Sequence, residues 1–285
     1  MDKISLEEII NRVEDVPSLP MVTSRIMELT EDPDATVTDI EREILKDQGL
    51  TSRVLRLANS VYYGFPRRIH TISEATVLLG FKVIKSITLA ATVSKVMLRE
   101  LPGYGLERQG LWTQSQACAM IARNIARELK YKNSDHAYVA GLLHDIGKVI
   151  LNTYVGEKYQ DILALVENKG KSFLEAEREI LGFDHGQVGA RVAEKWNLPE
   201  DLVEAIAYHH DPDKAKVNVF LTDIIHMADA IVMMMGISMG SDGMNYKFSE
   251  NTLKRLHIEE EQLHRWIAES ADMLTDLSGD ELLSS

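Results

Sequence analysis

The chain has 285 residues, 45% of them hydrophobic and 26% charged, which is the composition of a folded protein with a buried core. A formal net charge of −13 opposes non-specific binding to nucleic-acid phosphates, so we do not expect nucleic acid as a partner. The one cysteine, Cys118, excludes an intramolecular disulfide and fits a reducing compartment. No apolar stretch is long enough to cross a bilayer, and we therefore expect a cytoplasmic protein without membrane contact.

Helices are predicted along nearly the whole chain. A capping box, in which a short polar side chain and a longer one three residues later satisfy the first backbone amides, marks several helix starts. The pairs are Ser5 and Glu8, Thr38 and Glu41, Ser172 and Glu175, and Asp184 and Gln187. Prolines mark further helix boundaries, at Pro17, Pro20, Pro33, Pro66, Pro102 and Pro199. Strand-like alternation with hairpin turns is missing, so we predict an all-α fold.

Two interruptions divide this helical pattern. Residues 101–105 include a proline and two glycines, and residues 236–243 include three glycines. We therefore expect a helical N-terminal lobe over residues 1–100, a helical core over 106–235 and a C-terminal helical extension over 244–285.

Six side chains of the predicted core offer the nitrogen and oxygen donors that transition metals prefer. They are His144, Asp145, His185, His209, His210 and Asp229. Most of them fall at predicted helix ends, where clefts form, and Gly147 is expected to break the turn behind the first pair. If they converge, they can bind one or two metal ions, and such ions commonly drive phosphoester hydrolysis.

Asp229 gives a second reason to expect a cation. Asp229 is the one carboxylate within the strongly apolar segment 224–232. Burial of an unpaired carboxylate costs several kcal/mol. A nearby metal ion would offset this cost. The alternative is that the imidazoles cap helices and bond carbonyl groups, while Asp229 pairs with a helix amide or a lysine.

Two further side chains leave alternatives open. Lys148 is either a cation that contacts phosphate beside the site or a charge that complements the dipole at the C-terminal end of a helix. His226, one turn before Asp229, is a spare ligand, a partner of a ligand or an imidazole of the core.

The first hundred residues carry a more specific pattern. The segments are LPMV (19–22), EDP (31–33), LKD (45–47), LTSRVLRLANS (50–60), YG (63–64), ISEA (72–75) and LG (79–80). This part resembles the N-terminal half of the HDOD family, and the second half resembles the phosphohydrolase core of the related HD superfamily. The resemblance runs from about residue 16 to about residue 232. It implies a helical N-terminal lobe packed on an HD-like helical bundle, and a regulatory output module of bacterial signalling without established catalysis.

This sequence departs from many HDOD relatives, in which the metal site is degraded. All six candidate ligands stand where the related HD-GYP phosphodiesterases place theirs, so the resemblance implies an occupied site for one or two ions of iron, manganese or zinc. Two departures count against activity. Gln114 stands where related hydrolases carry a histidine, and the Gly-Tyr-Pro signature is absent after His210.

Two functions from different classes therefore compete. In the favoured one, the protein is a signalling module whose metal fixes the geometry of a surface or senses a ligand, and whose N-terminal lobe contacts an unknown signalling protein. The residues of the lobe that favour this function are Asn59, Ser60, Tyr62, Tyr63 and Gly64. Helix capping and packing are the alternative roles of these residues. In the other, it is a metal-dependent phosphohydrolase that acts on a nucleotide or cyclic dinucleotide, with Asp145 and Lys148 as the catalytic residues.

Nucleic-acid recognition is a third function to consider. It would depend on the arginines of the N-terminal lobe, which are Arg53, Arg56, Arg67 and Arg68. Such a group more often forms a solvated face with acidic neighbours, so we do not favour it.

Overall fold

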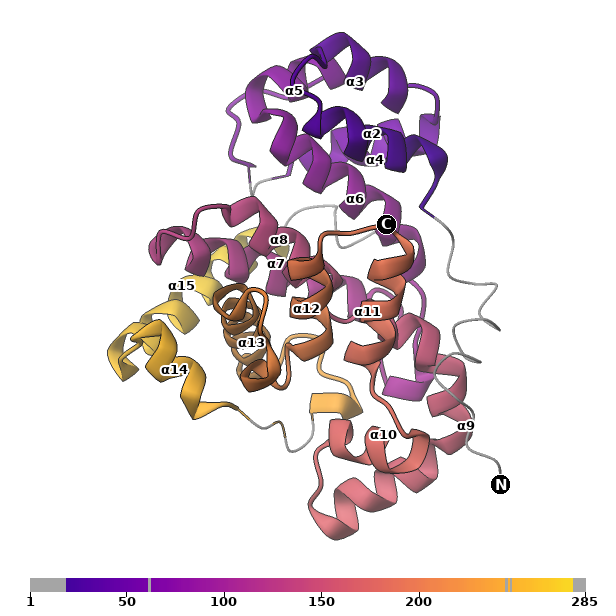
Figure 1. Cartoon of the computed structure of the whole chain (residues 1–285), viewed down its shortest axis with the longest axis vertical. Coiled ribbons are helices and arrows are strands. Elements are labelled where there is room, and N and C mark those ends of the chain that lie inside the picture. Colours follow the sequence, from indigo (N-terminus) through magenta and orange to yellow (C-terminus); the bar gives the residue numbers. More distant parts are fainter. Residues whose placement is uncertain (1–18, 61–62, 244–245, 247, 279–285) are drawn as a thin grey trace. The chain divides into compact units, whose positions relative to one another are not determined.

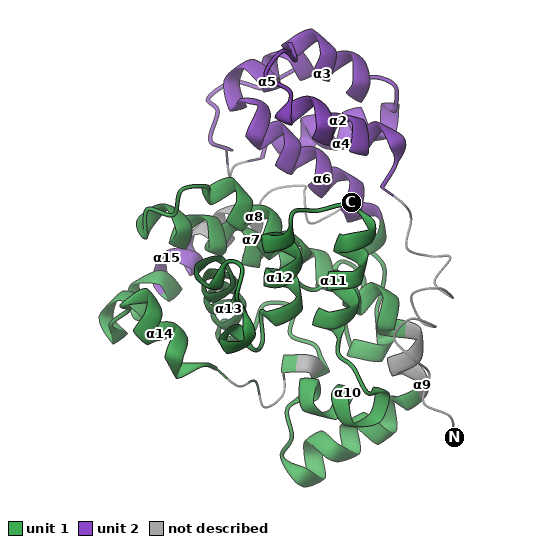
Figure 2. Cartoon of the chain, viewed as in Figure 1, with its two compact units in different colours: residues 1–17, 96–267 green, residues 18–95, 268–285 purple. Residues whose placement is uncertain are grey.

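Fourteen α-helices and no β-strand make up the part of the chain that the computed structural model describes, which confirms the predicted all-α class (Figure 1). The described residues are 19–60, 63–243, 246 and 248–278, with the side chains of 153–157, 242 and 273–278 left out. Contacts divide the chain into two units, one formed by residues 18–95 and 268–285 and the other by 96–267 and 1–17 (Figure 2). None of the described helices is both long and apolar enough to cross a membrane.

Among the described residues, the first unit is built mainly from five helices. They are α2 (Met21–Glu31), α3 (Val37–Ile44), α4 (Gln48–Ala58), α5 (Ile72–Leu79) and α6 (Phe81–Met97), whose last two residues belong to the other unit. Helix α3 packs against α2, α4 and α5, and it buries Ile40 and Ile44 completely. Apolar residues three or four positions apart therefore form the core of this unit.

Asn59 closes α4 and ties it to the chain that leads into α5. Its amide nitrogen donates to the backbone oxygens of Leu55 and Ile69, both at 2.8 Å, and its amide oxygen accepts from the backbone nitrogen of Ile69 at 2.7 Å. This one residue of the LANS segment thus caps a helix and fixes a loop, as the capping alternative predicts.

The second unit holds the remaining helices. They are α7 (Gly110–Glu128), α8 (Ser134–Leu143), α9 (Ile146–Lys169), α10 (Phe173–Leu181), α11 (His185–Lys195), α12 (Glu200–Tyr208), α13 (Val219–Met234), α14 (Glu250–Leu256) and α15 (Glu260–Ser278), with single 3-10 turns at Pro102–Tyr104 (η2), Pro212–Lys214 (η3) and Ser241–Gly243 (η4). Residues 268–278 of α15 are grouped with the first unit. Helix α7 packs against α8 and α13, α9 against α10 and α11, and α12 against α11 and α13.

The helix starts agree with the sequence in two of the predicted cases. Ser172 with Glu175 and Asp184 with Gln187 form complete capping boxes. The box predicted at Thr38 and Glu41 is wrong, because α3 begins two residues earlier and Thr36 caps it with Asp39. The pair Ser5 and Glu8 lies outside the described residues.

Gly147 does not break a turn, contrary to the sequence prediction. It lies inside α9, where a Cβ atom would be 1.9 Å from the backbone oxygen of His185 and 2.7 Å from the backbone nitrogen of Gly189. Gly141 of α8 meets α7 in the same way, because its Cβ would be 2.9 Å from Cα of Ala119. These two glycines allow close approach of the helices that surround the candidate site.

The start of α13 is fixed by a carboxylate of α12. Glu204, which is buried, accepts hydrogen bonds from the backbone nitrogens of Lys216, Val217 and Asn218 at 2.5–2.9 Å. Asn218 then caps α13 by accepting from the backbone nitrogen of Leu221.

Helix α14 is fastened to α13 by an ion pair between a partly exposed arginine and a buried carboxylate. Arg255 of α14 binds both oxygens of the fully buried Asp223, at 2.5 and 2.7 Å. The hydroxyl of Thr252 donates to the same carboxylate at 2.7 Å. Helix α14 is therefore held against the helix that carries Asp229.

Candidate metal centre

All the candidate ligands except Asp229 lie at or next to helix ends, as the sequence predicts. His144 follows the last residue of α8, and Asp145 immediately precedes α9. His185 is the first residue of α11, and His209 follows the last residue of α12. Asp229 differs, because it lies inside α13.

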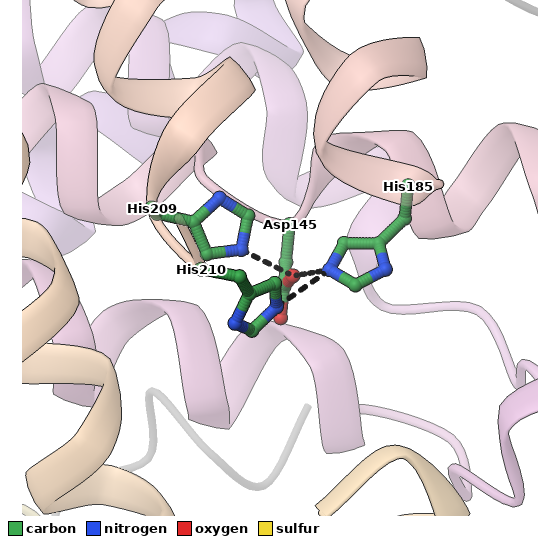
Figure 3. A group of neighbouring side chains, drawn as sticks. All are labelled: Asp145, His185, His209 and His210. Carbon is green, nitrogen blue, oxygen red and sulfur yellow. Dashed lines mark hydrogen bonds and ion pairs between the residues drawn. The ribbon is translucent and has the colours of Figure 1, made fainter. Parts of the chain in front are cut away.

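Three imidazoles surround the carboxylate of Asp145 (Figure 3). Oδ1 of Asp145 is 3.3 Å from Nε2 of His185 and 3.7 Å from Nε2 of His209. Nε2 of His210 faces Nε2 of His185 at 2.9 Å. The four ligand atoms lie within 4.8 Å of one another, a spacing that one metal ion could bridge.

A second group lies on the other side of the same carboxylate. Nε2 of His144 is 3.2 Å from Oδ2 of Asp145 and 3.3 Å from Oδ1 of Asp229. His144, His209 and Asp229 again offer ligand atoms within 4.8 Å of one another. The structure therefore brings all six predicted residues together, with Asp145 between two overlapping groups.

Hydrogen bonds to Nδ1 orient three of the imidazoles. Nδ1 of His144 bonds the backbone oxygen of Gly141 at 2.7 Å, and Nδ1 of His209 bonds that of Ile206 at 2.8 Å. Because a carbonyl oxygen only accepts, each Nδ1 must carry the proton, which leaves a lone pair on Nε2. Nδ1 of His185 contacts a carboxylate oxygen of Glu177 at 2.8 Å, with the same consequence. Metal-binding histidines are commonly held in this way.

The atoms that face the centre are unsatisfied. Nε2 of His144, Nε2 of His209 and Oδ1 of Asp145 are buried and make no hydrogen bond with any described residue. A buried polar atom without a partner costs about 1–3 kcal/mol, so three of them in one place call for a common partner. A cation satisfies imidazole lone pairs and a carboxylate oxygen at once, and the residues present therefore fit a metal ion.

Charges at the centre are distributed unevenly. Burial opposes protonation of His144, but the adjacent Asp145 carboxylate outweighs it and holds the pKa of His144 well above its usual value. Burial also works against ionised Asp145, yet the charges of His144 and Lys148 hold its pKa well below the usual range. Burial and the charge of His144 lower the pKa of His209 to about 3, so that imidazole is neutral and able to donate its lone pair.

Lys148 lies at the start of a helix, which rules out the alternative of a C-terminal helix charge. It occupies the first turn of α9 with 1% of its surface exposed, and its Nζ donates to Oδ2 of Asp145 at 2.5 Å. The ammonium group therefore compensates the negative charge of Asp145 at Oδ2, whereas His185 and His209 face Oδ1.

The sequence analysis missed Glu177, which is fully buried on α10. It accepts from the hydroxyl of Tyr104 at 2.6 Å, and from the backbone nitrogen and Nδ1 of His185 at 3.2 and 2.8 Å. A signal was present, because Glu177 shares the buried face of its helix with Phe173 and Ala176. A carboxylate on an apolar face suggests a buried polar partner.

His226 is a partner of a ligand, which decides between its three alternatives. Its Nδ1 bonds the backbone oxygen of His209 at 2.7 Å, and its Nε2 accepts from the backbone nitrogen of Ser249 at 2.9 Å. Both ring nitrogens are used, so neither is available to a metal ion.

Gln114, the residue that replaces an expected histidine, is buried on α7. Neither of its side-chain polar atoms bonds a described residue. Cys118 lies one turn further along α7, beside His144, and burial raises the pKa of its thiol. The amide of Gln114 is thus a further buried polar group of this unit that makes no hydrogen bond with a described residue.

A pocket of about 100 Å³ reaches two of the candidate ligands. His185 and His210 line it together with Arg178, Asp211 and Tyr246. Arg178 bridges the two carboxylates that adjoin these histidines, through Nε to Asp184 at 2.6 Å and Nη2 to Asp211 at 2.5 Å. The volume corresponds to about three water molecules, so a small group could enter beside the centre.

Comparison with known proteins identifies the family. The model of the HDOD domain matches residues 16–212. An uncharacterised protein of Treponema pallidum is 29% identical over 217 residues, covering 71% of this chain and 39% of that protein. Ribonuclease Y of Mycoplasmoides gallisepticum is 28% identical over 195 residues, covering 66% of this chain and 30% of that protein. The chain thus spans less than half the length of these curated relatives.

A solved structure supports the same assignment over the whole chain. The crystal structure of an HDOD domain protein of unknown function from Geobacter sulfurreducens has a TM-score of 0.79 at 26% identity, over 99% of this chain and 98% of that one. The family match also covers more than half of the sequence and includes five of the six candidate ligands. The chain therefore belongs to the HDOD domain family.

Proposed function

We propose that this protein is a regulatory HDOD module of signal transduction whose core holds one or two transition-metal ions. The observation that carries the proposal is the convergence of buried ligand atoms that make no hydrogen bond with a described residue, among them Nε2 of His144, Nε2 of His209 and Oδ1 of Asp145. A site that served packing alone would satisfy these atoms with protein groups.

Six residues would hold the metal, namely His144, Asp145, His185, His209, His210 and Asp229. Mixed imidazole and carboxylate donors suit iron, manganese or zinc. Lys148 compensates the charge of Asp145, and Glu177 keeps His185 in the tautomer that leaves Nε2 free to donate. When bound, the metal would supply Lewis acidity and a fixed geometry for the ends of four helices.

A second candidate function is phosphoester hydrolysis. It is favoured by the pocket that reaches His185 and His210, and by the similarity to a protein named for ribonuclease activity. A nucleotide or cyclic dinucleotide would present a phosphate group to this pocket, with Asp145 and Lys148 at the reacting centre. Gln114 in place of a histidine donor and the small volume of the pocket favour the regulatory module instead.

One experiment tests the proposal and separates the two candidates. The protein is purified without chelator, its metal content is measured before and after reconstitution with iron, manganese and zinc, and turnover is assayed with a generic phosphodiester and with cyclic dinucleotides. We expect bound metal and no turnover. Turnover that depends on the metal would favour the hydrolase, and failure to bind any metal after reconstitution would reject the centre.

A matched pair of variants controls this experiment. Asp145→Ala removes the carboxylate that contacts His144 of one group of ligands and His185 of the other, and it should abolish metal binding. Asp161→Ala makes the same substitution at an exposed position of the same helix and should leave the metal content unchanged.

A further inference from the structure

Tyr246, which is not one of the six predicted ligands, contacts the candidate ligand Asp229. It lies in the connection between η4 and α14, and its hydroxyl donates to Oδ2 of Asp229 at 2.9 Å. The other oxygen of Asp229, Oδ1, is 3.3 Å from Nε2 of His144. Oδ2 of Asp229 therefore accepts from the phenol and lies 3.7 Å from Nδ1 of His210, whereas Oδ1 lies beside His144.

The same segment reaches the centre by a second route. The backbone nitrogen of Ser249 donates to Nε2 of His226 at 2.9 Å, and Nδ1 of His226 bonds the backbone oxygen of His209 at 2.7 Å. The ring of Phe248 stacks on that of His226, with centroids 5.1 Å apart and an angle of 18° between the planes. Tyr246 thus contacts the candidate ligand Asp229 directly, whereas Ser249 is connected to His209 only through the imidazole of His226.

We propose that Tyr246 is a positioning residue of the metal centre, which holds Asp229 in the orientation that directs Oδ1 towards the ion. A carboxylate rotates readily about its last torsion, and a hydrogen bond to one oxygen restricts that rotation. Hydrogen-bond partners of metal ligands typically change metal affinity 10–100-fold. This role rests on the metal centre proposed above.

The position of the ring adds to this assignment. Its centroid is 5.5 Å from that of His210, and Tyr246 also lines the pocket beside the centre. The phenol is therefore part of the wall between the pocket and Asp229. Because Asp229 and Tyr246 both follow the segment that matches the family, the C-terminal part of this chain completes the centre that the family segment begins.

The test is the substitution Tyr246→Phe, which removes the hydroxyl and keeps the ring. We expect the dissociation constant for Zn²⁺, measured by competition with a chromogenic chelator, to rise about 10–100-fold. We also expect the visible spectrum of the Co²⁺-loaded variant to differ from that of the parent, because one ligand carboxylate changes orientation. A role in folding alone would move neither measurement once the circular dichroism of the two proteins is shown to be the same.

Tyr159→Phe provides a matched control. The hydroxyl of Tyr159 bonds Oγ of Ser241 at 2.6 Å, so it fastens the same connecting segment at η4 rather than at a ligand. We expect its metal affinity to equal that of the parent. An unchanged dissociation constant in Tyr246→Phe, or an equal loss in both variants, would overturn the role of Tyr246. Absence of metal binding by the parent protein would instead reject the centre itself.

Discussion

Replacement of Gly147 by alanine should destabilise the fold and the metal centre together. The added Cβ would lie 1.9 Å from the backbone oxygen of His185, whereas ordinary contacts of a Cβ begin at 3.4 Å, so α9 and α11 must separate by about 1.5 Å. Alanine gains about 1 kcal/mol over glycine inside a helix, but overpacking costs about 1–3 kcal/mol and occasionally more. Because the clash is between backbone and a fixed Cβ, we expect a net loss of about 2 kcal/mol, or roughly 4–8 °C in Tm.

The same displacement should weaken metal binding. His185 begins α11, so separation of the helices carries its Nε2 away from Oδ1 of Asp145, and metal sites tolerate errors of only about 0.2 Å in ligand distance. Thermal unfolding followed by circular dichroism and chelator competition measure the two effects. Gly49→Ala is the control, because its Cβ meets only movable side-chain atoms of Asp47 and Arg53. A Gly147→Ala protein with the parent's Tm and metal affinity would refute the close-approach argument.

Three further predictions concern separate parts of the molecule. Glu177→Gln keeps the shape of the side chain but removes the charge that holds Nδ1 of His185, so the dissociation constant for Zn²⁺ should rise about 10–100-fold, and an unchanged value in chelator competition would contradict this role. The pKa values of His144 and His185 are raised in the metal-free protein, because nearby carboxylates outweigh the effect of burial. Protons must therefore leave these residues before a metal binds, so metal affinity should go on increasing as the pH rises above about 6.5, the usual pKa of histidine. Proton release should be detectable by calorimetry in buffers of different ionisation enthalpy, and an affinity independent of pH would show that the imidazoles are already neutral. Asn59→Ala removes the bonds to the backbone of Ile69 and should lower the free energy of unfolding by about 2 kcal/mol in urea titrations, while a loss within about 0.5 kcal/mol would mean that the loop is held by other contacts.

The sequence was sufficient for the helical class and for the convergence of the six candidate ligands. Helix ends can be recognised locally, since Asp184 and Gln187 form the predicted capping box that places His185 in the first turn of α11. The first residue of α3 could not be determined from the local sequence, because Thr36 and Thr38 are both followed by an acidic residue three positions later. The structure has Thr36 as the cap, and neither candidate is distinguished from the other by its spacing to the acid.

The residues that support the candidate ligands were harder to find. Gly147 looks like a helix breaker in sequence, and only the position of His185 on a neighbouring helix explains why a glycine is needed there. Tyr246 follows a glycine-containing connection without periodicity, so nothing local indicates that the chain returns to Asp229. Such contacts depend on how distant segments meet, and local propensity carries no information about them.

The carboxylate of Glu204 has a consequence for how the protein opens. It belongs to α12, whereas the amides that it binds lead into α13, so separation of these helices would break all of these hydrogen bonds together. The two helices should therefore open as one cooperative unit, with the amide protons of residues 216–218 among the slowly exchanging ones. A partly open form that has released α14 would still keep His209 and His210, which follow α12, together with Asp229 of α13.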